Sequence, residues 1–320
     1  MKKNVLRIVF MGTPYFAAGV LQKLLDCSFQ IVGVITTPDK PAGRGQVMQK
    51  SSVKMLAEKT GLTILQPAKL KDEEFQSCLR SLNADLFIVV AFRMLPETVW
   101  KMPPLGTINL HASLLPQYRG AAPINWAIIN GETETGVTTF FIEKEIDTGK
   151  VIEQKRTEIS PDMTAGELHD ILLDLGADLV CSTVEKIASG AVSAVQQSAM
   201  MPYDLKDAPK IFKETCRLRF DLSAKQTHDL IRGLSPYPAA WCVVREADQS
   251  VRQFKLLKSS LTGISCDSYA TIKHHKEGIL FPCANEYLMI TELQPEGKRK
   301  MNYKEFLAGN SIEGSIIERS

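Results

Sequence analysis

The first half of the chain alternates short, wholly apolar runs with segments whose apolar residues recur at helical spacing. The apolar runs carry Val, Ile, Leu and Phe at successive positions, which is typical of strands buried on both sides of a parallel sheet. The predicted strands are Leu6–Met11, Ile31–Thr36, Asp85–Phe92 and Thr107–Leu110. The predicted helices between them are Tyr15–Asp26, Ser52–Thr60, Asp72–Leu82 and Ala122–Asn130. This βαβα order predicts a doubly wound α/β domain with a parallel sheet, in which ligands bind beyond the carboxyl ends of the strands.

The next segment departs from this alternation. A strand at Gly136–Phe141, a turn at Asp147-Thr148-Gly149 and a partner strand at Lys150–Gln154 predict a hairpin. A long helix is expected to begin near Pro161 and to end at about Ser189. Its end is indicated by Gly190, because glycine often follows the last residue of a helix.

Beyond residue 204 the pattern predicts a second domain. The segment 204–210 is polar and typical of a linker. Short strand-like runs follow at regular spacing, separated by turn residues, as in a small β-barrel. These runs are Ala240–Arg245, Phe254–Leu257, Tyr269–Ile272, Gly278–Pro282 and Tyr287–Leu293. We therefore predict domains at residues 1–203 and 211–320, joined by a linker at 204–210.

The composition is that of a folded protein without membrane helices. Hydrophobic residues make up 44% of the 320 residues, and no run approaches the roughly 20 apolar residues of a membrane helix. The apolar start is interrupted by Arg7 and lacks a small-residue cleavage site, so we interpret it as a strand and not as a signal peptide. The cysteines lack C-x-x-C spacing and the histidines lack ligand spacing. We expect a cytoplasmic monomer with no metal and no membrane partner.

The charge is distributed unevenly along the chain. The whole chain has a net charge of +2, but residues 205–320 hold 18 Lys and Arg against 14 Asp and Glu. A modestly basic C-terminal part is compatible with a nucleic-acid partner, although a difference of this size is also common in unrelated domains.

Two polar side chains lie at the carboxyl end of the strand predicted at Thr107–Leu110. Asn109 and His111 are two residues apart, so they face the same side of the strand. An Asn amide can donate a hydrogen bond to a developing oxyanion, and a His can carry a proton near neutral pH. For an isolated pair, buried side chains satisfied by backbone groups are the simpler explanation.

A third candidate is Asp147, in the turn Glu145–Gly149. Asp before Thr-Gly is a good turn former, and that role alone explains the residue. It gains a chemical role only if the fold brings it beside His111, where a carboxylate would orient the imidazole ring or hold a catalytic water.

Together these residues resemble a known family. The pattern is Asn-x-His at 109–111, Ser-Leu-Leu-Pro at 113–116 and a later Asp-x-Gly at 147–149. It is similar to the pattern of the folate-dependent formyltransferases, which include glycinamide ribonucleotide and sugar-nucleotide formyltransferases. The combination is specific, whereas none of its pieces is specific alone.

The resemblance implies a Rossmann-like first domain and 10-formyltetrahydrofolate as the formyl donor. It also implies a catalytic set consisting of Asn109, His111 and Asp147. The folate-binding residues that it implies are Ser113, Leu114, Leu115 and Pro116.

Three further features resemble the branch of this family that formylates methionyl initiator tRNA. The loop at 36–46 is similar to an insertion that enters the acceptor arm, although sugar-nucleotide enzymes have a similar loop. The segment Arg119–Ile124 is shared with the sugar-nucleotide enzymes. The C-terminal part resembles the OB-type β-barrel of the tRNA branch. Its segment Ile231–Trp241 resembles the element R-x-L-x-P-[YW]-P-G-A-[WF], with Ala239 where the family has Gly.

This branch implies a surface that binds tRNA. Arg and Lys in the loop would meet phosphates, its glycines would let the backbone approach the ligand, and lysines of the linker would run beside the RNA. Without the resemblance, a surface loop and a linker with solvated charges explain the same residues. The tRNA-binding residues implied are Lys40, Gly43, Arg44, Gly45, Lys206 and Lys210.

We therefore expect transfer of a formyl group from 10-formyltetrahydrofolate to the amino group of methionyl initiator tRNA. One alternative is a nucleotide-amino-sugar N-formyltransferase with the same three catalytic residues and a sugar-nucleotide pocket. A second is a 10-formyltetrahydrofolate hydrolase, in which water replaces the amine. A third is a non-catalytic RNA-binding protein, which the intact Asn109, His111 and Asp147 disfavour.

Overall fold

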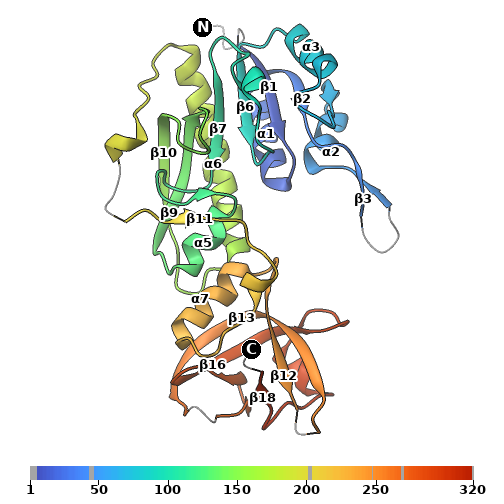
Figure 1. Cartoon of the computed structure of the whole chain (residues 1–320), viewed down its shortest axis with the longest axis vertical. Coiled ribbons are helices and arrows are strands. Elements are labelled where there is room, and N and C mark those ends of the chain that lie inside the picture. Colours follow the sequence, from blue (N-terminus) through green and yellow to red (C-terminus); the bar gives the residue numbers. More distant parts are fainter. Residues whose placement is uncertain (1–5, 43–46, 201–203, 247, 268–269, 319–320) are drawn as a thin grey trace. The chain divides into compact units, whose positions relative to one another are not determined.

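The chain folds into two compact units (Figure 1). The computed structural model describes residues 6–42, 47–200, 204–246, 248–267 and 270–318. Unit 1 comprises residues 1–120, 136–157 and 169–207, and unit 2 comprises residues 121–135, 158–168 and 208–320. Each unit is therefore made of three separate segments of the chain, and no single residue divides them. As functional domains, 1–203 and 211–320 with the linker 204–210 stay a prediction.

Unit 1 is built on a seven-stranded sheet with the strand order β10-β9-β7-β6-β1-β2-β5. The strands from β7 to β5 are parallel, and β9 runs antiparallel to β7. The predicted α/β class with a mainly parallel sheet is confirmed. The strands are β1 (Arg7–Gly12), β2 (Gln30–Ile35), β5 (Ile64–Leu65), β6 (Leu86–Val90), β7 (Thr107–His111), β9 (Glu134–Phe141) and β10 (Val151–Glu158).

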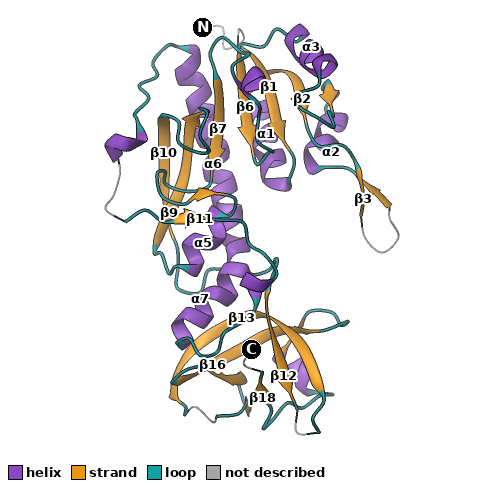
Figure 2. Cartoon of the chain, in the orientation of Figure 1, coloured by secondary structure: helices purple, strands orange, loops and turns teal. Residues whose placement is uncertain are grey.

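Helices cover both faces of this sheet (Figure 2). On one face, Phe75 and Leu79 of α3 pack with Val9 and Phe87 of the central strands. On the other face, Gly176 of α6 lies so close to Leu110 of β7 that a Cβ there would stand 2.8 Å from the leucine side chain. The helices are α1 (Tyr15–Asp26), α2 (Ser52–Lys59), α3 (Glu73–Ser81), α4 (Glu97–Trp100) and α6 (Ala165–Ala188). No helix among the described residues is long and apolar enough to cross a membrane.

The loop predicted at 36–46 contains part of a hairpin that projects from unit 1 (Figure 1). Its strands are β3 (Lys40–Ala42) and β4 (Val47–Gln49). At its base, the Asp39 carboxylate accepts hydrogen bonds from Lys54 Nζ at 2.6 Å and Gln66 Nε2 at 2.9 Å. These two bonds hold the pKa of Asp39 below its ordinary value. The base of the hairpin is thus fixed to α2 and to the segment after β5.

Unit 2 contains an antiparallel sheet with the order β14-β15-β16-β13-β12-β18, and β17 pairs with β16. A separate C-terminal β-sheet is confirmed, while its OB-type closure stays a prediction. The strands are β12 (Ala240–Arg245), β13 (Val251–Ser265), β14 (Lys273–His275), β15 (Gly278–Pro282), β16 (Glu286–Pro295), β17 (Met301–Asn302) and β18 (Ile316–Ile317). The other elements of the chain are β8 (Arg119–Gly120), α5 (Pro123–Ile129), η1 (Gln197–Met200), β11 (Asp207–Ala208), η2 (Glu214–Cys216), α7 (Ala224–Leu234) and α8 (Tyr303–Leu307).

The strand predicted at Tyr269–Ile272 is wrong, because β14 begins only at Lys273. Tyr269 lies outside the described residues. Ile272 is buried as its apolar character suggests, but its backbone pairs elsewhere: its N–H donates to Ser315 O at 2.9 Å and its carbonyl accepts from Gly314 N at 2.9 Å.

Ala239, where the resembled family has glycine, has a φ of +73°. This is the left-handed region that glycine adopts without steric cost. Ala239 therefore has the backbone conformation expected of the family's glycine, at the steric cost that a Cβ has in this region.

The helix α7 was not predicted, because polar residues interrupt its apolar stripe and are nevertheless buried. A capping box formed by Ser223 and Gln226 begins the helix. Asp229, 4% exposed, accepts a hydrogen bond from Arg232 Nε at 2.7 Å. His228, 2% exposed, contacts Ser259 Oγ at 2.9 Å through Nδ1. The polar groups that hide the helical pattern thus satisfy one another inside unit 2.

Burial lowers the pKa of His228, against the opposing effect of its hydrogen bond to the Pro161 carbonyl. Asp162, Asp229 and Arg232 are the charged groups that act on it. The unfolded chain binds the proton more readily, so His228 reduces stability as the pH falls below about 6.5.

We expect His228→Gln to flatten the fall in the free energy of unfolding between about pH 7 and pH 5. Urea denaturation at each pH measures it. His275→Gln, on β14, removes a half-buried histidine of the same unit and serves as the matched control. Equal slopes for His228→Gln and the unchanged protein would contradict the assignment.

Candidate functional site

The strand register places Asn109 and His111 on one face of the unit 1 sheet. Met11, Val89 and Asn109 are aligned across β1, β6 and β7, so their side chains share a face. This is the face that carries the hydrophobic cluster under α3. His111 follows two residues later, at the carboxyl end of β7, and is 6% exposed. The two side chains thus lie where an α/β sheet presents its ligand site.

One ring nitrogen of His111 is committed to the protein backbone. Nε2 lies 2.8 Å from the Tyr118 carbonyl oxygen. A carbonyl only accepts hydrogen bonds, so Nε2 carries the hydrogen. The other nitrogen, Nδ1, faces Asp147 Oδ2 at 3.8 Å, which is longer than a direct hydrogen bond. Nδ1 is therefore the ring atom available for chemistry.

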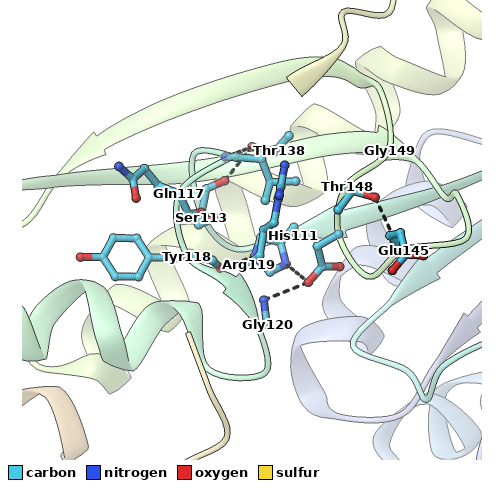
Figure 3. A network of polar contacts seen from close by, with 12 residues as sticks. His111, Ser113, Gln117, Tyr118, Arg119, Gly120, Thr138, Glu145, Thr148 and Gly149 are labelled. Atoms are coloured by element: carbon cyan, nitrogen blue, oxygen red, sulfur yellow. Dashed lines mark hydrogen bonds and ion pairs between the residues drawn. The ribbon is translucent and has the colours of Figure 1, made fainter. Parts of the chain in front are cut away.

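Asp147 comes to this site from the connection between β9 and β10. Its Oδ2 accepts the backbone N–H of Gly120 at 3.0 Å. The Thr148 hydroxyl donates to the Glu145 carbonyl at 3.0 Å and closes the turn (Figure 3). Asp147 has a φ of +54°, a conformation that Asp tolerates better than most residues. The structure thus brings Asp147 beside His111, the condition under which a chemical role was expected.

Asn109 is half-buried, and its side chain makes no hydrogen bond within the described part of the chain. A side-chain amide offers two N–H donors and an acceptor oxygen. The amide is therefore available to a ligand. Within the same described ranges, no group of three His, Cys, Asp or Glu side chains is arranged to hold a metal ion.

The loop at 113–116 is held by a hydroxyl on the neighbouring strand. Thr138 Oγ1, on β9, donates to the Ser113 carbonyl at 2.6 Å and accepts from Leu115 N at 3.1 Å. Gln154 Nε2, on β10, donates to the Leu115 carbonyl at 2.8 Å. The loop backbone is thus anchored to β9 and to the edge strand β10.

Most of the side chains predicted to bind folate lie inside the fold. Ser113, Leu115 and Pro116 are buried, and Leu114 is half-buried. Leu115 packs with the apolar cluster around Phe140. These residues consequently shape the loop, and a ligand would meet mainly its backbone.

Of the residues predicted to bind tRNA, the structure describes Lys40, Lys206 and Lys210. Lys40 and Lys210 are exposed. Lys206 is tied to the site loop through its backbone: its N–H donates to Gln117 Oε1 at 2.8 Å, and its carbonyl accepts from Tyr118 N at 2.7 Å. Gly43, Arg44 and Gly45 lie outside the described residues.

Several groups of the site were not predicted. The Tyr118 carbonyl and the Gly120 N–H are backbone atoms, which leave no residue-type signal. Thr138 lies opposite His111 in the β7–β9 pairing, so only the register of the sheet identifies it. The segment 91–95 follows β6 at the same edge of the sheet and carries Met94, which is 72% exposed. The carboxyl-end rule is the signal that would have indicated this segment.

We expect Gly149→Ala to lower turnover at least about tenfold, because the turn that carries Asp147 leaves no room for a Cβ. A Cβ there would stand 1.7 Å from the Phe141 carbonyl oxygen. Steady-state kinetics measure the effect. Gly309→Ala is the matched control, since nothing lies within 4 Å of its Cβ position. Wild-type turnover in Gly149→Ala would mean that the placement of this turn does not matter.

Comparison with known proteins supports the same family assignment as the residues of the site. Residues 6–184 match the family model of the formyl transferases, and residues 210–311 match that of the formyl transferase C-terminal domain. The methionyl-tRNA formyltransferase of Parabacteroides distasonis is 50% identical over 97% of both chains. That of Flavobacterium psychrophilum is 51% identical over 96% of both.

Among solved structures, the sugar 3N-formyl transferase WlaRD, determined in the presence of dTDP and 5-N-formyl-THF, matches with a TM-score of 0.65. The match covers 92% of this chain and 99% of that chain at 21% identity. At this identity the likeness shows the fold alone.

Proposed function

This chain belongs to the methionyl-tRNA formyltransferases of the formyl transferase family, and from this premise we propose that Asn109, His111 and Asp147 carry out its reaction. It transfers a formyl group to the free amino group of methionyl-tRNA, which serves the initiation of translation. The single observation that carries the proposal is that Asp147, from the connection between β9 and β10, lies 3.8 Å from His111 at the carboxyl end of β7, the strand that also carries Asn109.

The residues present suit a bound 10-formyltetrahydrofolate, which supplies the formyl group. When an amine adds to a formyl carbon, negative charge develops on the formyl oxygen, and hydrogen-bond donors aimed at that oxygen lower the barrier. The amide of Asn109, which has no hydrogen-bond partner among the described residues, and the uncommitted Nδ1 of His111 are such donors. His111 must be protonated to donate from Nδ1, because its Nε2 hydrogen is already used by Tyr118.

Asp147 has two roles in the proposed reaction. Its carboxylate lies 3.8 Å from Nδ1 and orients the ring of His111. It also accepts the proton that the amine loses as the new C–N bond forms. Asp147 would then return this proton to the nitrogen that leaves the formyl carbon, so the site ends the reaction with the protons that it began with.

The folate site is proposed to lie between two strand-end segments. The backbone of 113–116 forms one wall, fixed by Thr138 and Gln154. The segment 91–95, which follows β6 at the same edge, forms another wall and offers the exposed side chain of Met94.

The proposed tRNA surface uses Lys40 of the projecting hairpin together with Lys206 and Lys210. Lys210 Nζ lies 5.5 Å from the centre of the Phe212 ring, and Phe212 is 59% exposed. A basic side chain beside an exposed aromatic ring suits the backbone and bases of RNA. Gly43, Arg44 and Gly45 belong to the proposal on their resemblance alone. A substrate of this kind implies action in the cytoplasm, and we propose a monomer.

Asn109→Ala, His111→Ala and Asp147→Asn should each lower turnover on the order of 10²–10⁴-fold. The expected cause is loss of an oxyanion donor in the first two and of the proton acceptor in the third. Rates of formyl-methionine formation on initiator tRNA measure this. Three folded variants with near wild-type turnover would refute the mechanism.

The acceptor is tested in three parallel reactions with purified protein and 10-formyltetrahydrofolate. One contains methionyl initiator tRNA, the second an amino-sugar nucleotide and the third no acceptor. Transfer to the tRNA alone is the expected result. Formylation of the sugar, or folate turnover without an acceptor, would overturn the acceptor while leaving the site chemistry in place.

The double variant Lys40→Gln, Lys210→Gln should raise the KM for tRNA several-fold and leave kcat near the wild-type value, because these charges meet phosphates remote from the reaction. The slope of log affinity against log salt should also become shallower by about one for each phosphate that no longer meets a lysine. Kinetics over a salt series measure both. Lys59→Gln, an exposed lysine of α2, is the control. Unchanged KM and slope would remove these lysines from the interface.

A further inference from the structure

Gln197 is a buried side chain that binds the backbone of the proposed catalytic aspartate and of the turn that carries it. It begins η1 and is 1% exposed. Its Nε2 donates to the Asp147 carbonyl at 2.9 Å and to the Gly149 carbonyl at 2.8 Å. Its Oε1 accepts from Arg119 Nε at 3.0 Å and Nη2 at 2.6 Å. A carboxamide has two N–H donors and two lone pairs, so every hydrogen-bonding position of Gln197 is filled.

The backbone that carries Gln197 is placed independently of the Asp147 turn. Val195 pairs with Val151, the first residue of β10, through hydrogen bonds of 2.9 and 2.8 Å. Val195 lies two residues before Gln197, so the segment after α6 is fixed to the sheet before it reaches the turn. Gln197 can therefore act as a fixed point against which the turn is held.

Gln197 also links the two groups that orient the Asp147 carboxylate. On one side it binds the main-chain carbonyl of Asp147 itself. On the other side it binds Arg119, and the next residue, Gly120, donates its N–H to Asp147 Oδ2 at 3.0 Å. One side chain thus sets the backbone of Asp147 and the position of the donor that its carboxylate meets.

Besides Gln197, the turn is held by the Thr148 hydroxyl on the Glu145 carbonyl and by the Gly120 N–H on Asp147. Residues 143–146 are exposed, with Ile146 at 58%. The position of this turn sets the distance of 3.8 Å between Asp147 Oδ2 and His111 Nδ1. A displacement of about 1 Å is enough to cost a catalytic group much of its effect.

We propose that Gln197 is a positioning residue for formyl transfer, which holds Asp147 beside His111 by clamping its turn to Arg119. The inference rests on the proposed catalytic role of Asp147. A carboxamide is required because the site needs donors toward two carbonyls and an acceptor toward a guanidinium on one rigid plane. Glutamate in this place would keep an acceptor for Arg119, now as an ion pair, but would oppose its other oxygen to the two carbonyls.

The test is a double-mutant cycle measured as kcat and KM for formyl transfer to methionyl initiator tRNA. Gln197→Met keeps length and apolar volume and removes the hydrogen bonds. We expect it to lower kcat about 10- to 100-fold, with both KM values changed less than about threefold. In the Asp147→Asn background, the same substitution should lower kcat less than about threefold, because the group that it positions is already lost.

Two further variants keep the test decisive. Gln197→Glu retains the acceptor for Arg119 and should also lower kcat about 10- to 100-fold. It replaces Gln197→Met in the test if that variant folds poorly. Gln196→Met changes the exposed neighbouring glutamine and should leave kcat unchanged.

The outcomes separate the inference from its premise. Full loss from Gln197→Met on top of Asp147→Asn, or wild-type kcat in the folded Gln197 variants, would overturn the positioning role and leave the catalytic role of Asp147 intact. Wild-type kcat in Asp147→Asn would overturn the proposed mechanism, and the inference with it.

Discussion

The site depends on one hydrogen bond, from Nε2 of His111 to the carbonyl of Tyr118. This bond decides which nitrogen of the ring is left for chemistry and turns it toward Asp147. The residue that provides the carbonyl is itself held, since the N–H of Tyr118 donates to the carbonyl of Lys206. Two segments therefore fix the tautomer of the proposed catalytic histidine. One is the chain just after the proposed folate loop, and the other is the start of the predicted linker.

The site is assembled from parts with different mechanical properties. Asn109 and His111 stand on a buried strand, the most rigid support that a sheet offers. Asp147 lies on an exposed turn, which is held in place by the close packing of Gly149 and by the hydrogen bonds of Gln197. The strand presents the proposed oxyanion donors and the turn presents the proposed proton acceptor. A reaction in which charge and proton move together requires these two supports to keep a fixed separation.

Much of the first unit was predictable, because buried parallel strands are apolar at every position and helices between them are amphipathic. The same-face placement of Asn109 and His111 followed from the two-residue repeat of a strand. The approach of Asp147 did not, since no local pattern encodes the path of a turn across a sheet. Gln197 was unpredictable for a related reason: a lone glutamine remote in sequence has no signature until its partners are known. In unit 2, helix α7 was missed because His228 and Arg232 satisfy their polarity internally, which hides the apolar stripe.

The anchored base of the β3–β4 hairpin has a thermodynamic consequence for any partner that it meets. Lys54 and Gln66 fix Asp39 when the protein folds, so the ordering of the hairpin base is completed before a partner arrives. Conformational entropy that is already lost on folding is not lost again on association. A projecting arm with a fixed root can therefore bind with a smaller entropic penalty than a free loop of the same length, and substitutions beyond the root can alter what the arm recognises without loosening the sheet that carries the chemistry.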